Sequence, residues 1–192
     1  PSNQAKIWML SERETTANYV WLGADDSDWN NNANWSGGQV PNSTSDVFIP
    51  DASETPNDPI LPTSTEIKSL TIEQGGILYG GYNTELTING RLEDNYGTPS
   101  LSNSGLFIPE TSTVTFTNGN AAVAGTIDFY NLIVPVDDTL RIINNSTIRI
   151  AGTLTVDGIL RTVFDGPTTI EYNGDNQTVI IPNPSTNRYY NL

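Results

Sequence analysis

Aspartate and asparagine side chains crowd into one short stretch of the sequence, WLGADDSDWNNNANWSGGQVP, at positions 21–41. Asp25, Asp26 and Asp28 place three carboxylates close together, and three consecutive asparagines follow Trp29. Carboxylate and amide oxygens are the ligands that Ca²⁺ prefers, and it takes roughly six to eight of them. The three aspartates are therefore candidate calcium ligands. Asp and Asn also form tight turns by bonding to the nearby backbone, so a purely structural role stays open.

The same stretch holds three of the four tryptophans of the chain, Trp21, Trp29 and Trp35. An exposed aromatic face can stack on a sugar ring, which makes these residues candidates for glycan binding. Large rings can also close the end of a hydrophobic core, because they bury more apolar surface than other side chains. The sequence favours the second interpretation, in which the tryptophans cap the N-terminal end of the fold.

Catalytic chemistry has little support in the residue types. The chain has no histidine and no cysteine, which removes the most common general base and every thiolate nucleophile. A glycosidase needs two carboxylates that face each other about 5–10 Å apart. Acidic pairs such as Asp137 and Asp138 are adjacent in the sequence, so their side chains point apart in a strand. We expect a protein that is not an enzyme.

The charge of the chain excludes some partners. Eight Lys and Arg residues stand against 22 Asp and Glu residues, which gives a formal net charge of −14. Binding of nucleic acid requires clustered basic side chains that neutralise phosphates. No apolar run approaches the roughly 20 residues that a membrane-spanning helix requires. We therefore predict no nucleic-acid partner and no membrane insertion.

Short strands must position these residues. From Tyr19 onward, apolar residues alternate with polar ones, as in SLTIE at 69–73, TVTFT at 113–117 and TIRIA at 147–151. Alternation with period two is typical of half-buried strands. Gly, Asn, Asp and Pro separate these runs, as turns require. The pattern predicts an all-β fold.

Apolar positions also recur at a fixed longer spacing. The pairs are 20 or 22 residues apart: Leu132 and Leu154, Leu140 and Leu160, and Ile148 and Ile170. This spacing suits one coil of a parallel β-helix, in which three short strands per coil stack on the coil below. We therefore predict a right-handed parallel β-helix, or β-solenoid, with an N-terminal cap. A β-sandwich is the alternative.

A second self-similarity has an offset of 62 residues. It relates the spacing of Leu70, Leu78 and Leu86 to that of a second set of residues, Leu132, Leu140 and Ile148. We interpret this offset as a larger repeat of about 60 residues that contains several strands.

The segment YVWLGADDSDWNNNANWSGGQVPNSTSDVFIP resembles a motif that opens the β-solenoid regions of large secreted, adhesin-like proteins of Bacteroidota with type IX secretion. The degenerate coil motif that follows is similar too, so the resemblance covers about residues 19–192. It implies an extracellular or cell-surface location and a role in display or adhesion. The matching residues are Trp21, Gly23, Ser27, Asp28, Trp29, Asn34, Trp35, Ser36, Gly38, Val40, Pro41, Asp46, Val47 and Ile49.

These observations divide the chain into three parts: a flanking segment at 1–18, a capping region at 19–64 and solenoid coils at 65–192. Leu192 occupies the first inward position of a further coil, so we expect a C-terminal truncation of a longer protein. An open solenoid end exposes unpaired backbone groups. We expect the continuation of the parent chain, or self-association, to cover that end.

The predicted function is that of a non-catalytic structural or adhesion domain in a larger secreted or cell-surface bacterial protein. A carbohydrate-binding module is the alternative, in which the tryptophans or Tyr79, Tyr82 and Tyr96 contact glycan. A polysaccharide-active enzyme domain is a weaker alternative. The expected partners are a host or environmental glycan or a cell-surface protein. No cofactor is expected apart from the candidate Ca²⁺.

Overall fold

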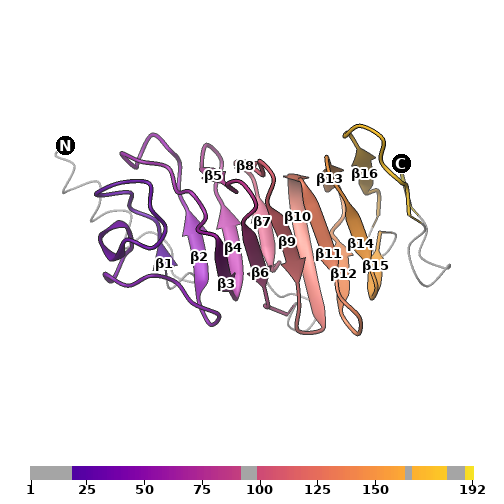
Figure 1. Cartoon of the computed structure of the whole chain (residues 1–192), viewed down its shortest axis with the longest axis horizontal. Helices are drawn as coiled ribbons and strands as arrows, with labels where there is room; N and C mark the ends of the chain where they lie inside the picture. Colours follow the sequence, from indigo (N-terminus) through magenta and orange to yellow (C-terminus); the bar gives the residue numbers. More distant parts are fainter. Residues whose placement is uncertain (1–18, 92–98, 163–165, 181–188) are drawn as a thin grey trace.

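The computed structural model describes residues 19–91, 99–162, 166–180 and 189–192. Short strands stack side by side along the long axis of the molecule, and they follow chain order from one end to the other (Figure 1). Neighbouring strands in the sheets are parallel, as in the pairing of β12 with β15. The predicted all-β solenoid is confirmed, with about five turns. The β-sandwich alternative is wrong, because sandwich sheets are antiparallel.

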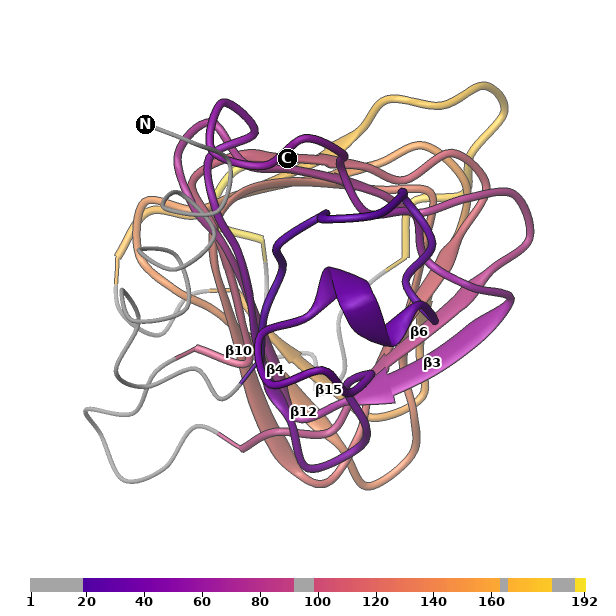
Figure 2. The same ribbon diagram turned by 90° about the vertical axis from the view of Figure 1, so that its left-hand side faces the viewer.

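Each coil passes through three faces of the solenoid. Viewed from the N-terminal end, the chain runs clockwise through the faces as it recedes from the viewer (Figure 2). The solenoid is therefore right-handed, which is the hand that parallel strand connections normally take. We name the faces 1, 2 and 3 in the order in which the chain visits them within a coil.

Face 1 contains the longest series of strands. Its members pair in sequence from the N-terminal end to the C-terminal end of the solenoid. They are β1 (Tyr19–Val20), β2 (Asp46–Ile49), β4 (Ser69–Ile72), β7 (Leu101–Asn103), the first half of β10 (Asn120–Phe129), β12 (Thr139–Ile142) and β15 (Ile159–Arg161).

Faces 2 and 3 complete each coil. Face 2 contains β5 (Ile77–Tyr79), β8 (Leu106–Ile108), the second half of β10, β13 (Thr147–Ile150) and β16 (Thr169–Tyr172). Face 3 contains β3 (Ser64–Ile67), β6 (Glu85–Ile88), β9 (Thr113–Phe116), β11 (Asn131–Val134) and β14 (Leu154–Val156). Side chains alternate along these strands: in β13, Ile148 and Ile150 are buried, whereas Thr147 and Arg149 face outward.

The spacing of 20 to 22 residues is the length of one coil. Leu132 lies directly beside Leu154 on face 3, and Leu140 lies directly beside Leu160 on face 1. On face 2, Ile148 is likewise the partner of Ile170. The three pairs predicted from the sequence are therefore confirmed in register, one on each face.

The interpretation of the 62-residue offset as a repeat unit is wrong. Leu70 lies on face 1 in β4, whereas Leu132 lies on face 3 in β11. Leu78 lies on face 2 in β5, whereas Leu140 lies on face 1 in β12. The offset therefore spans two coils and two further faces, not a whole number of coils. The reason is that all three faces use the same sequence of short strands and tight turns.

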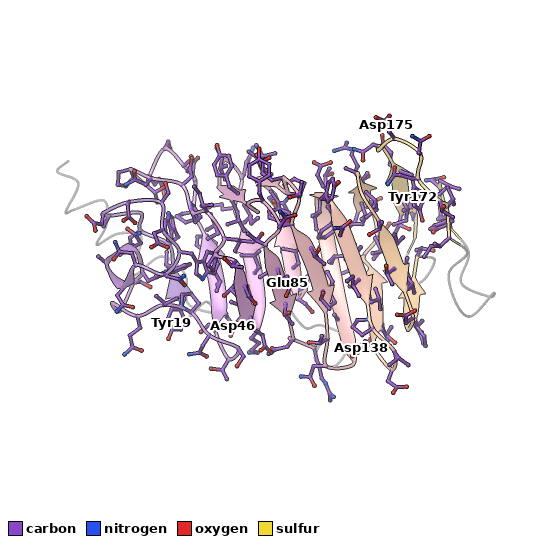
Figure 3. The ribbon with its side chains drawn as sticks, viewed as in Figure 1. Tyr19, Asp46, Glu85, Asp138, Tyr172 and Asp175 are labelled. Carbon is purple, nitrogen blue, oxygen red and sulfur yellow. The ribbon has the colours of Figure 1, made fainter. Side chains whose placement is uncertain are left out.

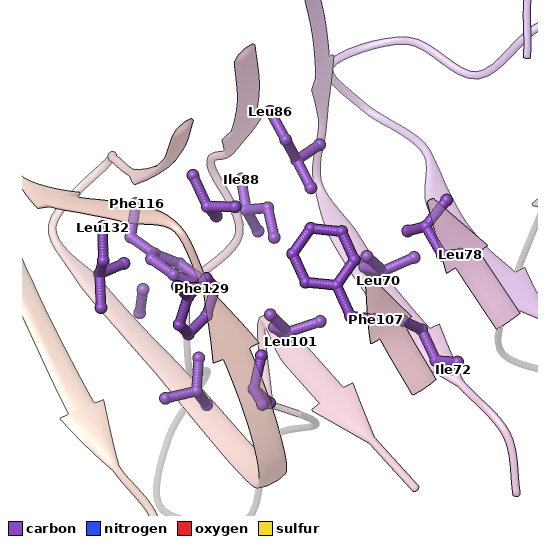
Figure 4. Close-up of a cluster of buried hydrophobic side chains, with 14 of the residues drawn as sticks. Leu70, Ile72, Leu78, Leu86, Ile88, Leu101, Phe107, Phe116, Phe129 and Leu132 are labelled. Atoms are coloured by element: carbon purple, nitrogen blue, oxygen red, sulfur yellow. The ribbon is translucent and has the colours of Figure 1, made fainter. Parts of the chain in front are cut away.

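The coils share one hydrophobic core, which runs through the stack of strands. Near its middle, Phe129 packs edge to face against Phe107 and Phe116, with ring centroids 6.3 and 6.4 Å apart (Figure 4). Phe107 and Phe129 come from face 2, and Phe116 comes from face 3. Aromatic contacts thus join two faces across the interior. Each fully buried large apolar side chain contributes about 1.5–3 kcal/mol.

Strand β10 turns the corner between faces 1 and 2 as one continuous strand. Its first half pairs with β7 and β12, and its second half pairs with β13. Gly125 lies at the corner with a φ of +104°, and a Cβ atom there would overlap the backbone carbonyl of Asn103. The corner therefore requires glycine, because other residues have neither the conformation nor the space.

Residues near the C-terminal end fold back onto the last coils. Tyr172 lies at the end of the solenoid opposite Tyr19 (Figure 3). Its hydroxyl group lies 2.9 Å from the hydroxyl group of Tyr189. The Tyr189 hydroxyl donates a hydrogen bond to the backbone carbonyl of Ile180. Burial, reinforced by Tyr172, raises the pKa of Tyr189, so its hydroxyl stays a donor. The Gln177 side-chain amide donates to two carbonyls of the preceding coil.

Candidate functional site

The tryptophan-rich loop lies across the N-terminal end of the solenoid. The loop and the short 3₁₀ helix η1 (Asn32–Asn34) cover the interior of the first coils (Figure 2). Trp21 and Trp29 are completely buried, and Trp35 is 1% exposed. Trp35 packs edge to face against both other rings, with centroids 4.9 Å from Trp21 and 4.7 Å from Trp29. The three indoles form the N-terminal layer of the core.

Hydrogen bonds fix two of these rings. The indole of Trp21 donates to the carbonyl of Asn57, and the indole of Trp35 donates to the carbonyl of Trp29, each at 2.7 Å. A sugar-binding platform needs an aromatic face that solvent can reach. These rings are buried and present no such face, as the capping interpretation expects, so the burial does not support glycan binding at Trp21, Trp29 and Trp35, which stays a prediction.

The aspartates of the loop are organised around one buried amide, Asn34. The Asn34 Oδ1 atom accepts hydrogen bonds from the backbone N–H groups of Asp25 and Asp26, at 2.9 and 3.2 Å. Its Nδ2 atom donates to the carboxylate of Asp26 at 2.7 Å and to the carbonyl of Asp28 at 3.0 Å. Asn34 is fully buried, so its amide is satisfied on both sides, as a buried polar group requires.

The carboxylates themselves accept protein donors. Asp25 and Asp26 share the side-chain amide of Asn31, at 2.8 and 3.2 Å, and Asp28 accepts from the backbone of Asn30 at 2.9 Å. The hydrogen bond from Asn34 lowers the pKa of Asp26, with a smaller effect from the backbone of Asp28. Within the described residues, no group of three acidic, His or Cys side chains could hold a metal ion. The carboxylates of Asp25 and Asp26 are thus engaged by amide groups of the loop, and a calcium site at Asp25, Asp26 and Asp28 stays a prediction.

The acidic pair at the start of β12 also serves the fold. The carboxylate of Asp138 accepts a hydrogen bond of 2.6 Å from the backbone N–H of Gly119 in the preceding coil. Asp137 adopts a φ of +67° in the turn. The two side chains are thus part of a turn between coils.

A surface feature of a different kind lies on the outside of face 2. Five apolar or aromatic side chains point away from the core there, and we name them the apolar strip: Ile60, Ile77, Tyr79, Leu106 and Ile108. Tyr79 pairs with Ile60 on one side and with Ile108 on the other, so these three form a row along the solenoid axis. Ile77 and Leu106 form a second, parallel row.

Burial shows that the apolar strip faces solvent. Ile60 is 46% exposed and Leu106 is 44% exposed, while Ile77, Tyr79 and Ile108 are half-buried. The residues between them, Leu78 and Phe107, point into the core. Contiguous exposed apolar surface marks a contact site more often than isolated exposed apolar residues do.

The sequence does contain a pattern that predicts this strip, although it differs from the alternation of apolar and polar residues. Most strands alternate apolar and polar residues, but β5 reads ILY and β8 reads LFI. Three consecutive apolar residues in a strand place one side chain inward and two outward, because the side-chain period is two. Such a triplet between turn residues therefore predicts an apolar outer surface as well as a buried position.

Polar groups border the apolar strip. Asp28 pairs with Ile60 and so lies at the N-terminal end of the row. It is one of the three candidate calcium ligands named from the sequence, and the structure places it beside the apolar strip. Tyr82, which is 74% exposed, lies just after β5. Its hydrogen bond with Glu110, reinforced by the charge of Glu110, raises its pKa. Tyr96, the third tyrosine predicted to contact glycan, lies outside the described residues.

The C-terminal half of face 2 has a different outer surface. Thr126, Thr147 and Thr169 form a row of hydroxyl groups on neighbouring strands. Beside it, Arg149 lies 3.5 Å from Asp128 and 3.1 Å from Glu171. The outer surface thus changes from apolar to polar along one face. No described helix is long and apolar enough to cross a membrane.

Comparison with known proteins gives one positive result. No curated protein and no solved structure matches the chain. A family model matches residues 20–128, which include the tryptophan loop and the whole apolar strip, whereas Arg149 and Glu171 lie beyond the match. Because the matched region is more than half of the chain, the chain belongs to this family, a domain of unknown function designated DUF8693.

Proposed function

We propose that this domain is a non-catalytic structural and adhesion domain of a larger secreted or cell-surface bacterial protein. The observation that carries the proposal is the apolar strip, an exposed apolar surface on the outer wall of the solenoid. By contrast, the side chains that could have done chemistry serve the fold, as the hydrogen bonds of Asp26 and Asp138 illustrate.

The architecture supports a display role. Parallel strands on three faces hold the outer side chains in fixed positions, so a surface built on them is organised before it meets a partner. The net charge of −14 favours solubility and disfavours contact with nucleic acid. The proposed location outside the cell rests on the resemblance of the tryptophan-rich loop to adhesin-like proteins of Bacteroidota with type IX secretion.

A carbohydrate-binding module is the second candidate, and Tyr79 favours it. Its side chain lies within the apolar strip, flanked in register by Ile60 and Ile108. An aromatic side chain on a flat apolar surface is a common way to hold the C–H face of a sugar ring.

An adhesion assay tests the proposal. Fluorescent beads coated with the folded domain are applied to epithelial cells, to mucin and to insoluble polysaccharide particles. Beads coated with an unrelated acidic protein serve as the control for charge. We expect retention of the domain-coated beads on at least one surface. Retention equal to the control on every surface, or release of sugars from a polysaccharide panel, would overturn the proposal.

A further inference from the structure

We infer that the apolar strip binds the flat C–H face of a neutral, extended polysaccharide. The inference rests on the proposed adhesive function and names the ligand class for it. Its basis is the outward row of Ile60, Tyr79 and Ile108 with the second row beside it.

The shape of the strip suits a linear sugar chain. Neighbouring strands lie about 4.8 Å apart and alternate residues of a strand lie about 6.6 Å apart. Three coils therefore give a surface about 10 Å long and two side chains wide, which matches roughly two sugar rings. Because Tyr79 and Ile108 lie on paired strands and Ile60 is bridged to Tyr79, the row is extended, which suits a linear ligand.

The size of the strip argues against a folded protein as the partner. Specific protein–protein interfaces use roughly 20–30 residues from each side. The strip has five residues, and the same face becomes polar beyond it, at Thr126 and Arg149. The strip is thus too small for a stable protein complex or for a dimer of this chain. A second copy would also carry the same charge of −14.

Charge restricts the ligand further. Asp28 lies at one end of the row, and Glu110 lies two residues after Ile108 along the chain. Neighbouring carboxylates repel an anionic polysaccharide, whereas they accept hydrogen bonds from the hydroxyl groups of a neutral one. An apolar centre with acceptors near it matches a sugar ring, which has C–H groups on its faces and hydroxyl groups on its edge.

Pull-down on insoluble particles tests this inference. The probes are microcrystalline cellulose and chitin as neutral polysaccharides, with insoluble polygalacturonate as the anionic comparison. We expect the full chain to bind a neutral particle and not polygalacturonate. The variants Tyr79→Ser and Leu106→Ser should each weaken that binding by about tenfold or more, since each removes apolar contact area.

Two further variants separate the strip from effects on folding. Tyr79→Phe keeps the ring and should retain binding, and Thr147→Ala changes an outward residue in the polar half of face 2 and should leave binding unchanged. Thermal melts establish that each variant is folded. Unchanged binding by the folded Tyr79→Ser variant, or equal binding to polygalacturonate, would overturn the inference.

The bead assay distinguishes the two proposals. If domain-coated beads adhere to cells or mucin while no neutral polysaccharide is bound, the adhesive function stands and the polysaccharide inference falls. Loss of that adhesion in Tyr79→Ser would then assign the strip to a ligand of another class on those surfaces. If the beads adhere nowhere, both proposals fail.

Discussion

The indole N–H of Trp35 donates a 2.7 Å hydrogen bond to the backbone carbonyl of Trp29, and the two rings pack edge to face with centroids 4.7 Å apart. Trp35 thus provides the hydrogen-bond donor for the backbone carbonyl of Trp29 and also packs against its ring. The Trp29 indole N–H, in contrast, is buried and has no hydrogen-bond partner within the described part of the chain. The two tryptophans therefore differ in bonding although both are core residues.

This difference predicts unequal effects of the same substitution. Trp35→Phe leaves the buried carbonyl of Trp29 without a donor, which costs about 1–3 kcal/mol in addition to the lost ring volume. Trp29→Phe loses similar volume but removes a buried donor that has no partner. We expect the free energy of unfolding to fall more for Trp35→Phe, as measured by urea denaturation. Equal losses for the two variants would contradict the assigned hydrogen bond.

Two glycines with positive φ allow the cost of backbone conformation to be measured separately from the cost of steric overlap. Gly125→Ala would place a methyl group against the carbonyl of Asn103, whereas the space around Gly38 is open. We expect Gly38→Ala to cost about 1–2 kcal/mol, the price of a left-handed conformation for alanine. Gly125→Ala should cost about 4 kcal/mol or more, or prevent folding. Circular dichroism melts give both values, and similar losses would argue against a closed corner in β10.

The lowered pKa of Asp26 predicts an acid-sensitive tryptophan loop. A carboxyl group with a lowered pKa in the folded state stabilises that state above its unfolded pKa, and the contribution disappears as the pH falls through the folded value. The reference value is 3.8 and the folded pKa lies below it. Asp26→Asn should therefore be less stable than the natural chain at pH 6, and the gap should close toward pH 2.

Unfolding curves measured from pH 2 to pH 6 test this expectation. Asp157→Asn, a substitution at an exposed aspartate far from the loop, serves as the matched control. Its difference from the natural chain should stay small at every pH. A gap for Asp26→Asn that does not change with pH would show that the carboxylate acts only through its shape.

The ion pairs on face 2 predict a salt-dependent effect. Arg149 lies near two carboxylates, those of Asp128 and Glu171, whereas Lys68 lies 3.0 Å from the carboxylate of Asp46. All these side chains are partly exposed, so each pair contributes about 0.2–1 kcal/mol. Arg149→Met should cost up to about twice as much as Lys68→Met at low salt. In about 1 M salt, both losses should shrink, because screening acts within about 3 Å.

The coil length was predictable from the sequence for a simple physical reason. Inward residues of one coil must pack on those of the next, so apolar residues recur at the coil length, as Leu132 and Leu154 do. The 62-residue offset resembles a repeat unit because strands on all three faces share the same alternation of apolar and polar residues. Sequence self-similarity alone cannot distinguish an offset of a whole number of coils from an offset that is one face shorter.

The roles of polar and outward residues were less predictable. Composition does not distinguish aspartates that bind a metal ion from aspartates that accept hydrogen bonds from amide groups. The arrangement of these aspartates depends on the buried side chain of Asn34, which bonds to Asp25 and Asp26. Alternation does not predict the apolar strip, because it places apolar residues of a strand in the core. In β5 and β8, the neighbours of Leu78 and Phe107 are apolar and yet face outward.

The direction of the hydrogen bonds between coils has a mechanical consequence. The strands lie across the long axis, so the bonds that join them point along it (Figure 1). Tension applied between the two ends pulls directly on these bonds, and a coil detaches only when its strands on all three faces separate. Strand β10, continuous across two faces, would couple their rupture. Stretching in an optical trap would then release length in steps of about one coil.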